Sequence, residues 1–159
     1  MNVPEIRPLG EPCDFDDSSL LFLGYVPETE TVRVVLSTPD EWDHERLWEI
    51  QLSGVLRMDL ESVGDGGTQH PDSPPEIYSV YLDDKDSERA RWVRRLRETG
   101  AREPEQVHCV MLASSYLRGW GERENLEGIR IVCRQWTIGP APAEFSGREF
   151  QRPKIPAGP

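Results

Sequence analysis

Between Leu47 and Glu61, apolar residues and one glycine occupy every even-numbered position, and polar residues occupy most of the odd-numbered positions. The even-numbered set is Trp48, Ile50, Leu52, Gly54, Leu56, Met58 and Leu60. A period of two residues is that of a strand with one buried and one wet face, which is usual in antiparallel sheets. The pattern predicts one long strand, or two strands broken at Ser53-Gly54, and Gly54 is a candidate bulge.

Two pairs of apolar segments predict hairpins. Residues 19–26 and 31–37 are joined by a short turn around Pro27, and residues 106–115 and 128–138 are separated by a polar turn. Residues 77–84 predict one further strand. By contrast, the glycines and prolines of residues 64–75 predict a loop without regular structure.

One helix is predicted between these strands. Asp86 or Ser87 caps its start, it runs to about Thr99, and Gly100 follows its end. Its narrow apolar stripe is formed by Ala90, Val93 and Leu96 beside Trp92, whereas arginines occupy most other positions.

This order of elements predicts an α+β fold. We expect a mostly antiparallel sheet of about six to seven strands with one main helix packed on a face. A chain of 159 residues suits one continuous core. The predicted boundaries are a single domain over residues 1–138 and an irregular, Pro/Gly-rich extended tail over 139–159.

Charge is distributed unevenly along the chain. The net charge is −11, but residues 1–88 hold 21 acidic and 5 basic residues, giving −16, and residues 89–159 hold 8 and 13, giving +5. Part of the arginine set should therefore pair inside the molecule. An acidic chain disfavours nucleic acid and favours a basic protein partner. Neither a bilayer-length apolar run nor a signal-peptide pattern occurs, so no membrane association is expected and a cytoplasmic location is predicted.

The histidine and cysteine side by side at His108 and Cys109 do not predict a catalytic pair. Neighbouring residues of a strand point to opposite faces, so these two side chains cannot act together. Cys109 and Cys133 are interpreted as thiols of the core. No nucleotide-binding, hydrolase or zinc-protease motif is present. We therefore expect no cofactor and favour a protein without enzymatic activity.

The candidate partner-binding surface is one face of the last predicted strand. Arg130, Arg134 and Trp136 alternate along that face, and His108 and Tyr116 of the neighbouring strand could border it. Arginine and tryptophan are enriched at binding hot spots. An equally weighted interpretation is a helix-covered face whose arginines reach acidic neighbours.

Two other hypotheses stay open. Carboxylate oxygens can hold divalent cations, so a metal-dependent enzyme would use acidic clusters that contain Asp14, Asp16, Asp17, Asp40, Asp43 and His44. No complete calcium-binding loop is present there, which weakens this alternative. The other hypothesis is an oligomeric structural subunit, a homo-oligomer in which the arginine-rich helix of one chain pairs with the acidic half of another.

The first strands carry a resemblance to a known group of proteins. Residues 15–20 (FDDSSL), the strand from Val32 to Leu36, and the run Ile50, Leu52, Val55, Leu56, Met58 and Leu60 resemble the opening of small bacterial α+β proteins grouped with the immunity proteins of polymorphic toxin systems. The resemblance covers roughly residues 14–61, with weaker similarity in the final strands. Those proteins more usually carry a His-Asp pair where this chain has Asp16-Asp17. The resemblance implies a non-enzymatic protein that neutralises a toxin by covering it, and an acidic surface would suit a basic toxin.

Overall fold

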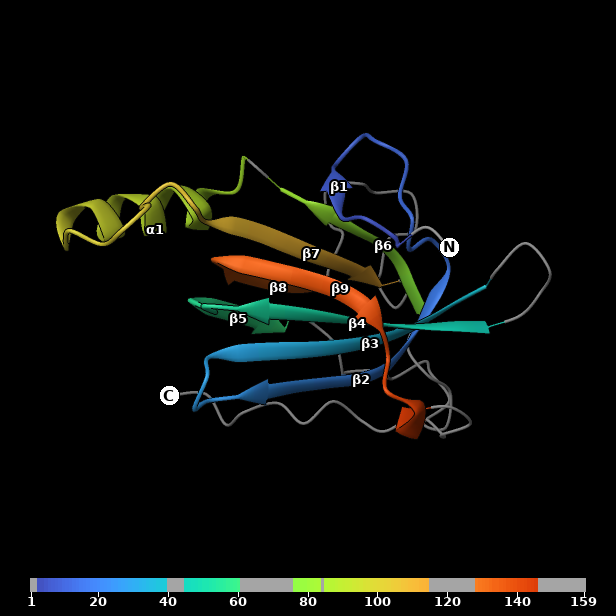
Figure 1. Cartoon of the computed structure of the whole chain (residues 1–159). Coiled ribbons are helices and arrows are strands. Elements are labelled where there is room, and N and C mark those ends of the chain that lie inside the picture. Colours follow the sequence, from blue (N-terminus) through green and yellow to red (C-terminus); the bar gives the residue numbers. More distant parts are fainter. Residues whose placement is uncertain (1–2, 40–44, 61–75, 84, 115–127, 146–159) are drawn as a thin grey trace.

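The computed structural model describes residues 3–39, 45–60, 76–83, 85–114 and 128–145 (Figure 1). Its strands are β1 (Arg7–Pro8), β2 (Ser18–Val26), β3 (Thr31–Pro39), β4 (Glu45–Ser53), β5 (Arg57–Leu60), β6 (Glu76–Leu82), β7 (His108–Ser114), β8 (Gly128–Cys133) and β9 (Gln135–Pro140). The helix α1 spans Ser87–Glu98, and a short 3-10 turn spans Ala143–Phe145. The predicted loop 64–75 and the tail beyond residue 145 lie outside the described residues.

The helix and most of the strands predicted from the sequence are confirmed, but the single strand predicted over residues 128–138 is two strands, β8 and β9. β2 and β3 form an antiparallel pair, as do β7 and β8. The helix begins after Asp86 and ends before Thr99, and Gly100 follows with a φ of 70°. The long alternating segment is two strands, β4 and β5, which are broken at Gly54.

The predicted arrangement of these elements was wrong. Hydrogen bonds connect the described strands in the order β5-β8-β7-β6-β2-β3-β4-β9, with β1 beside β6. β2 and β6 pair only through Ser18 and Ser19, so the strands divide at this point into a sheet of five (β1, β5, β6, β7, β8) and a sheet of four (β2, β3, β4, β9). The fold is therefore mostly sheet in two layers, rather than a single sheet of six or seven strands with a main helix on one face.

A folded two-stranded ribbon connects the sheets at their other end. β4 pairs with β9 in the four-stranded sheet, and β5 pairs with β8 in the five-stranded sheet. The segment that joins β4 to β5 and the segment that joins β8 to β9 pass from one sheet to the other side by side. Arg134 N donates to Ser53 O at 3.1 Å, and Leu56 N donates to Val132 O at 2.8 Å. Gly54 makes the turn with a φ of +62°, a conformation that side chains rarely adopt. A β-carbon there would also lie 2.7 Å from Arg134 Cγ.

The main core lies between the two sheets, because each central strand turns alternate side chains inward. Its buried residues are Ile6, Phe15, Leu20, Leu23, Val32, Val34, Leu36, Trp48, Ile50, Leu52, Val80, Val110, Leu112, Ile129, Ile131 and Cys133. The predicted inward face of β4 is part of this set. In β7, however, Val110 and Leu112 face the main core, whereas Cys109 and Met111, which were predicted to face it, lie on the opposite face of the strand. Removal of this apolar surface from water is the main source of the stability of the fold.

A second, smaller apolar cluster lies on the outer face of the five-stranded sheet. Its buried members are Tyr81, Val107, Cys109, Met111, Ala113 and Val132. Trp92, Val93 and Leu96 of α1 pack against it, but none of the residues of α1 is fully buried. The helix extends beyond the end of the sheet and does not form a layer of the fold (Figure 1). No helix in the described part of the chain is long and apolar enough to cross a membrane.

Candidate protein-binding surface

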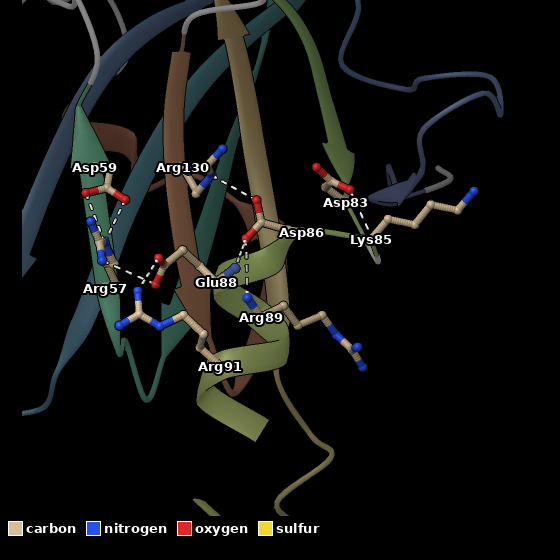
Figure 2. Close-up of polar contacts among 9 residues, drawn as sticks. All are labelled: Arg57, Asp59, Asp83, Lys85, Asp86, Glu88, Arg89, Arg91 and Arg130. Carbon is tan, nitrogen blue, oxygen red and sulfur yellow. Dashed lines mark hydrogen bonds and ion pairs between the residues drawn. The ribbon is translucent and has the colours of Figure 1, made fainter. Parts of the chain in front are cut away.

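The start of α1 is fixed to the five-stranded sheet by a buried carboxylate. Asp86 accepts hydrogen bonds from the backbone N–H groups of Glu88 and Arg89, at 2.8 and 3.3 Å, and so caps the helix. Its other oxygen lies 3.2 Å from Arg130 Nε of β8 (Figure 2). The Asp86 side chain is only 5% exposed, so this ion pair joins the helix to the sheet largely away from water.

A second group of charges lies beside the first and connects α1 to the edge strand β5. Arg57 donates to Asp59 at 2.8 Å and to Glu88 at 3.2 Å, and Arg91 donates to the other oxygen of Glu88 at 3.0 Å (Figure 2). The hydrogen bond to Asp59, with the charges of Asp59 and Glu88, raises the pKa of Arg57 above its ordinary value. The first turn of α1 is therefore held at two places on the sheet.

The remaining helix surface presents arginines to solvent. Arg94, Arg95 and Arg97 are exposed, as is Arg102 in the segment that follows. Arg95 lies over the ring of Trp92, 5.2 Å from its centroid, and Arg97 forms an ion pair with Glu105. Arg94 and Arg102 have no acidic partner among the described residues. For these exposed residues, Arg94, Arg95 and Arg97 of the helix together with Arg102 of the following segment, we use the name arginine face of α1.

The chemistry of this surface suits carboxylates. A guanidinium group stays charged at any physiological pH and can donate two parallel hydrogen bonds to one carboxylate. Residues 87–106 contain six arginines and four glutamates, so this segment is basic within an acidic chain. The arginine face can therefore bind an acidic surface, even though the chain as a whole repels negative charge.

The partner-binding residues predicted from the sequence do not share one face. Arg130 points to the outer face of the five-stranded sheet, toward Asp86. Trp136 packs toward the main core and meets His108 edge to face, with ring centroids 4.7 Å apart. Arg134 lies at the crossing between β8 and β9 and donates to the backbone oxygens of Arg102 and Glu103. Tyr116 lies outside the described residues.

The position of Arg130 on the outer face is similar to the one expected under the alternative interpretation, in which a helix covers the face that carries the arginines. There, an arginine was expected to reach an acidic neighbour, and Arg130 reaches Asp86 at the helix start. The sequence did not indicate the pairing of Arg57 with Glu88, because the two residues are 31 positions apart in the chain. The arginines of α1 could be recognised in the sequence. The sequence did not indicate that the helix extends beyond the end of the sheet (Figure 1).

The residues proposed as metal ligands are placed only in part. Asp14 accepts a hydrogen bond from Arg7 at 2.6 Å and one from Glu5 N at 2.9 Å. Partial burial alone would raise the pKa of Asp14, but these hydrogen bonds outweigh it and lower the pKa below its ordinary value. Asp16 and Asp17 are exposed in the turn before β2, and Asp40, Asp43 and His44 lie outside the described residues. The described residues contain no group of three side chains that could hold a metal ion.

The buried cysteines give a direct chemical prediction. Burial raises the pKa of Cys109 and of Cys133 to about 12, from an ordinary value of 9.0. Since the thiolate is the reactive form, we expect dithiobis(nitrobenzoate) at pH 8 to modify no more than one thiol of the folded chain. That thiol is the half-buried Cys13, and denaturant should expose all three. A Cys13→Ser variant is the control, and reaction of its folded form at the unfolded rate would contradict the prediction.

Comparison with known proteins identifies no family. No protein-family model matches the chain, and no curated protein matches it. The crystal structure of an uncharacterised protein from Neisseria gonorrhoeae is similar in structure, with a TM-score of 0.49 and 11% identical residues. The match covers 82% of this chain and 97% of that chain. The chain, whose own structure is rich in sheet, therefore has a distant structural neighbour from a bacterium.

Proposed function

We propose that the chain is a non-enzymatic, cytoplasmic protein-binding domain that uses the arginine face of α1 to bind an acidic surface of its partner. The observation that supports this proposal is the position of α1. The helix contributes no fully buried residue, yet its first turn is fixed by two groups of ion pairs. A helix of 12 residues is marginal in water by itself. Its anchoring with only partial burial of Trp92, Val93 and Leu96 is understandable if its role is to present side chains.

A protein partner fits these charges better than nucleic acid does. Nucleic acids carry dense negative charge, and the net charge of −11 would repel a long phosphate backbone over most of the molecule. An acidic protein can place its carboxylates against α1 alone and keep its other surfaces away from the acidic parts of the chain.

A basic partner is the second candidate, and one observation favours it. Asp16 and Asp17 are exposed in the turn before β2, and no ion pair engages either of them among the described residues. Asp17 adopts a φ of 56°, so this turn holds its two carboxylates in a defined backbone conformation. Carboxylates of this kind would attract a basic toxin, as the net charge predicts.

Charge reversal on α1 tests the proposal. The immobilised chain would be used to capture proteins from lysate of the native host at low salt, with the captured proteins identified by mass spectrometry. We expect Arg94→Glu to weaken capture of a specific acidic protein by about tenfold, because a like charge would then face the partner. The matched control is Lys85→Glu, which makes the same charge change at an exposed residue outside the helix.

Each outcome separates the candidates. If Arg94→Glu and Lys85→Glu weaken capture of the acidic protein equally, only the net charge of the chain affects capture, and the proposal is contradicted. Loss of capture after nuclease treatment would identify nucleic acid as the bound species. A basic protein that is released by Asp16→Arg, but retained by Arg94→Glu, would support the second candidate instead.

A further inference from the structure

One strand edge at the end of the hydrogen-bonded order has no partner strand within the described part of the chain. β9 pairs with β4 on one side, and no described strand pairs with its other side. Gln135 and Thr137 are exposed on its outer face. At Gly139, an added β-carbon would meet no atom within 4 Å. The outer face of this strand is therefore open at these three residues, and its second edge has no hydrogen-bonded strand among the described residues.

The backbone groups that point away from β4 can be assigned from the pairing. Ala141 N donates to Leu47 O at 3.0 Å, so these two residues are a hydrogen-bonded pair. Such pairs alternate in an antiparallel ladder. Gly139, Thr137 and Gln135 therefore bond to β4, while the N–H and C=O groups of Trp136 and Ile138 point outward. Pro140, which has no N–H to donate, falls at an outward position, as proline in a sheet should.

The strand at the opposite end of the order is protected in a way that β9 is not. β5 carries Arg57 and Asp59, and Arg57 is also paired with Glu88 of α1. Charged side chains on an edge discourage the addition of another strand. β9 has the sequence QWTIGP, without a charged residue, in a chain whose residues are 30% charged.

We propose that β9 pairs antiparallel with β9 of a second copy of the chain, across a two-fold axis. In this register Trp136 lies opposite Ile138 of the second copy, and each strand donates the two outward N–H groups of Trp136 and Ile138. Thr137 then faces Thr137 of the second copy on the outer face. Pairing of this kind joins the two four-stranded sheets into one continuous sheet.

The charge of the chain favours this edge over other contacts between copies. Two chains of net charge −11 repel each other, and an uncharged strand is a place where they can approach without like charges in contact. Salt screens the remaining repulsion. The dimer should therefore strengthen as salt rises, whereas capture of a partner through α1 should weaken. This inference is independent of the proposed function.

Cysteine crosslinking tests the register. Residues facing each other in a non-hydrogen-bonded pair have Cα atoms about 4.5 Å apart, which a disulfide can span. We expect mild oxidation to convert Thr137→Cys into a covalent dimer on a non-reducing gel. Gln135→Cys is the matched control, because Gln135 is equally exposed but would face Gly139 of the second copy. Equal crosslinking of both variants, or of the wild-type chain, would overturn the proposal.

Light scattering over a dilution series tests the association itself. We expect twice the 18.2 kDa mass of one chain for the wild type at high salt. Thr137→Glu should weaken dimer formation by about tenfold, because two carboxylates would meet at the two-fold axis. Thr137→Ser is the control for the fold and should remain dimeric. A wild-type chain that stays monomeric at all salt concentrations would overturn the proposal.

Discussion

Gly128→Ala is expected to lower the free energy of unfolding by about 3 kcal/mol, a large effect for the addition of one methyl group. A β-carbon at this position would lie 2.2 Å from the backbone oxygen of Leu112 and 3.1 Å from the Cα of Ala113. Both atoms belong to β7, whose other edge is paired with β6. The strand cannot move away from the new methyl group without disturbing hydrogen bonds on both sides.

Gly139→Ala is the matched control, since it adds the same methyl group to a glycine of another strand. No atom lies within 4 Å of the added carbon at Gly139, so we expect a change within about 0.5 kcal/mol. Urea denaturation monitored by tryptophan fluorescence measures both variants. Equal stability of the two variants would show that β7 and β8 do not approach each other as closely as described.

Asp86→Ala is expected to cost about 2 to 3 kcal/mol. The variant loses the helix cap, which is worth about 1 kcal/mol. It also leaves Arg130 Nε, which is buried and already lacks a hydrogen bond of good geometry, without its ion-pair partner. The Arg130 side chain is 33% exposed, so the second contribution is smaller than for a fully buried pair.

Two companion variants separate these contributions. Asp86→Ser retains a capping oxygen and removes the charge, so it should recover the part of the loss that belongs to the cap. Asp86→Ser combined with Arg130→Met removes both charges, and it should be more stable than Asp86→Ser alone. Urea denaturation and the helical circular dichroism signal are the measurements. A double variant less stable than the single one would contradict the assigned role of Arg130.

The elements could be predicted from the sequence because their signals are local. The cap at Asp86, the end at Gly100 and the period of two in β4 each depend on neighbouring residues. The division into two sheets could not be predicted from the sequence, because apolar residues remain at even-numbered positions on both sides of Gly54. Only the glycine marks the corner, and a bulge within a straight strand would have the same signal.

The strand predicted over residues 128–138 presents the same difficulty, because it is divided between the two sheets as β8 and β9. Ile129, Ile131 and Cys133 face the main core, but after Arg134 the inward residues are Trp136 and Ile138. The alternation therefore changes from odd to even positions at the crossing. An uninterrupted strand places Arg130 and Trp136 together, whereas the folded ribbon separates them. The contact between Asp86 and Arg130 joins residues far apart in the sequence, so no local pattern could indicate it.

The pairing of β4 with β9 has a consequence for synthesis of the chain. β2, β3 and β4 leave the ribosome early, but β4 lacks its second neighbour until residues 135–140 have been made. During that interval, β4 exposes an unpaired edge beside Trp48, Ile50 and Leu52, which could pair with another nascent chain. The first 88 residues carry a net charge of −16. We expect this charge to keep neighbouring nascent chains on a polysome apart until the ribbon closes.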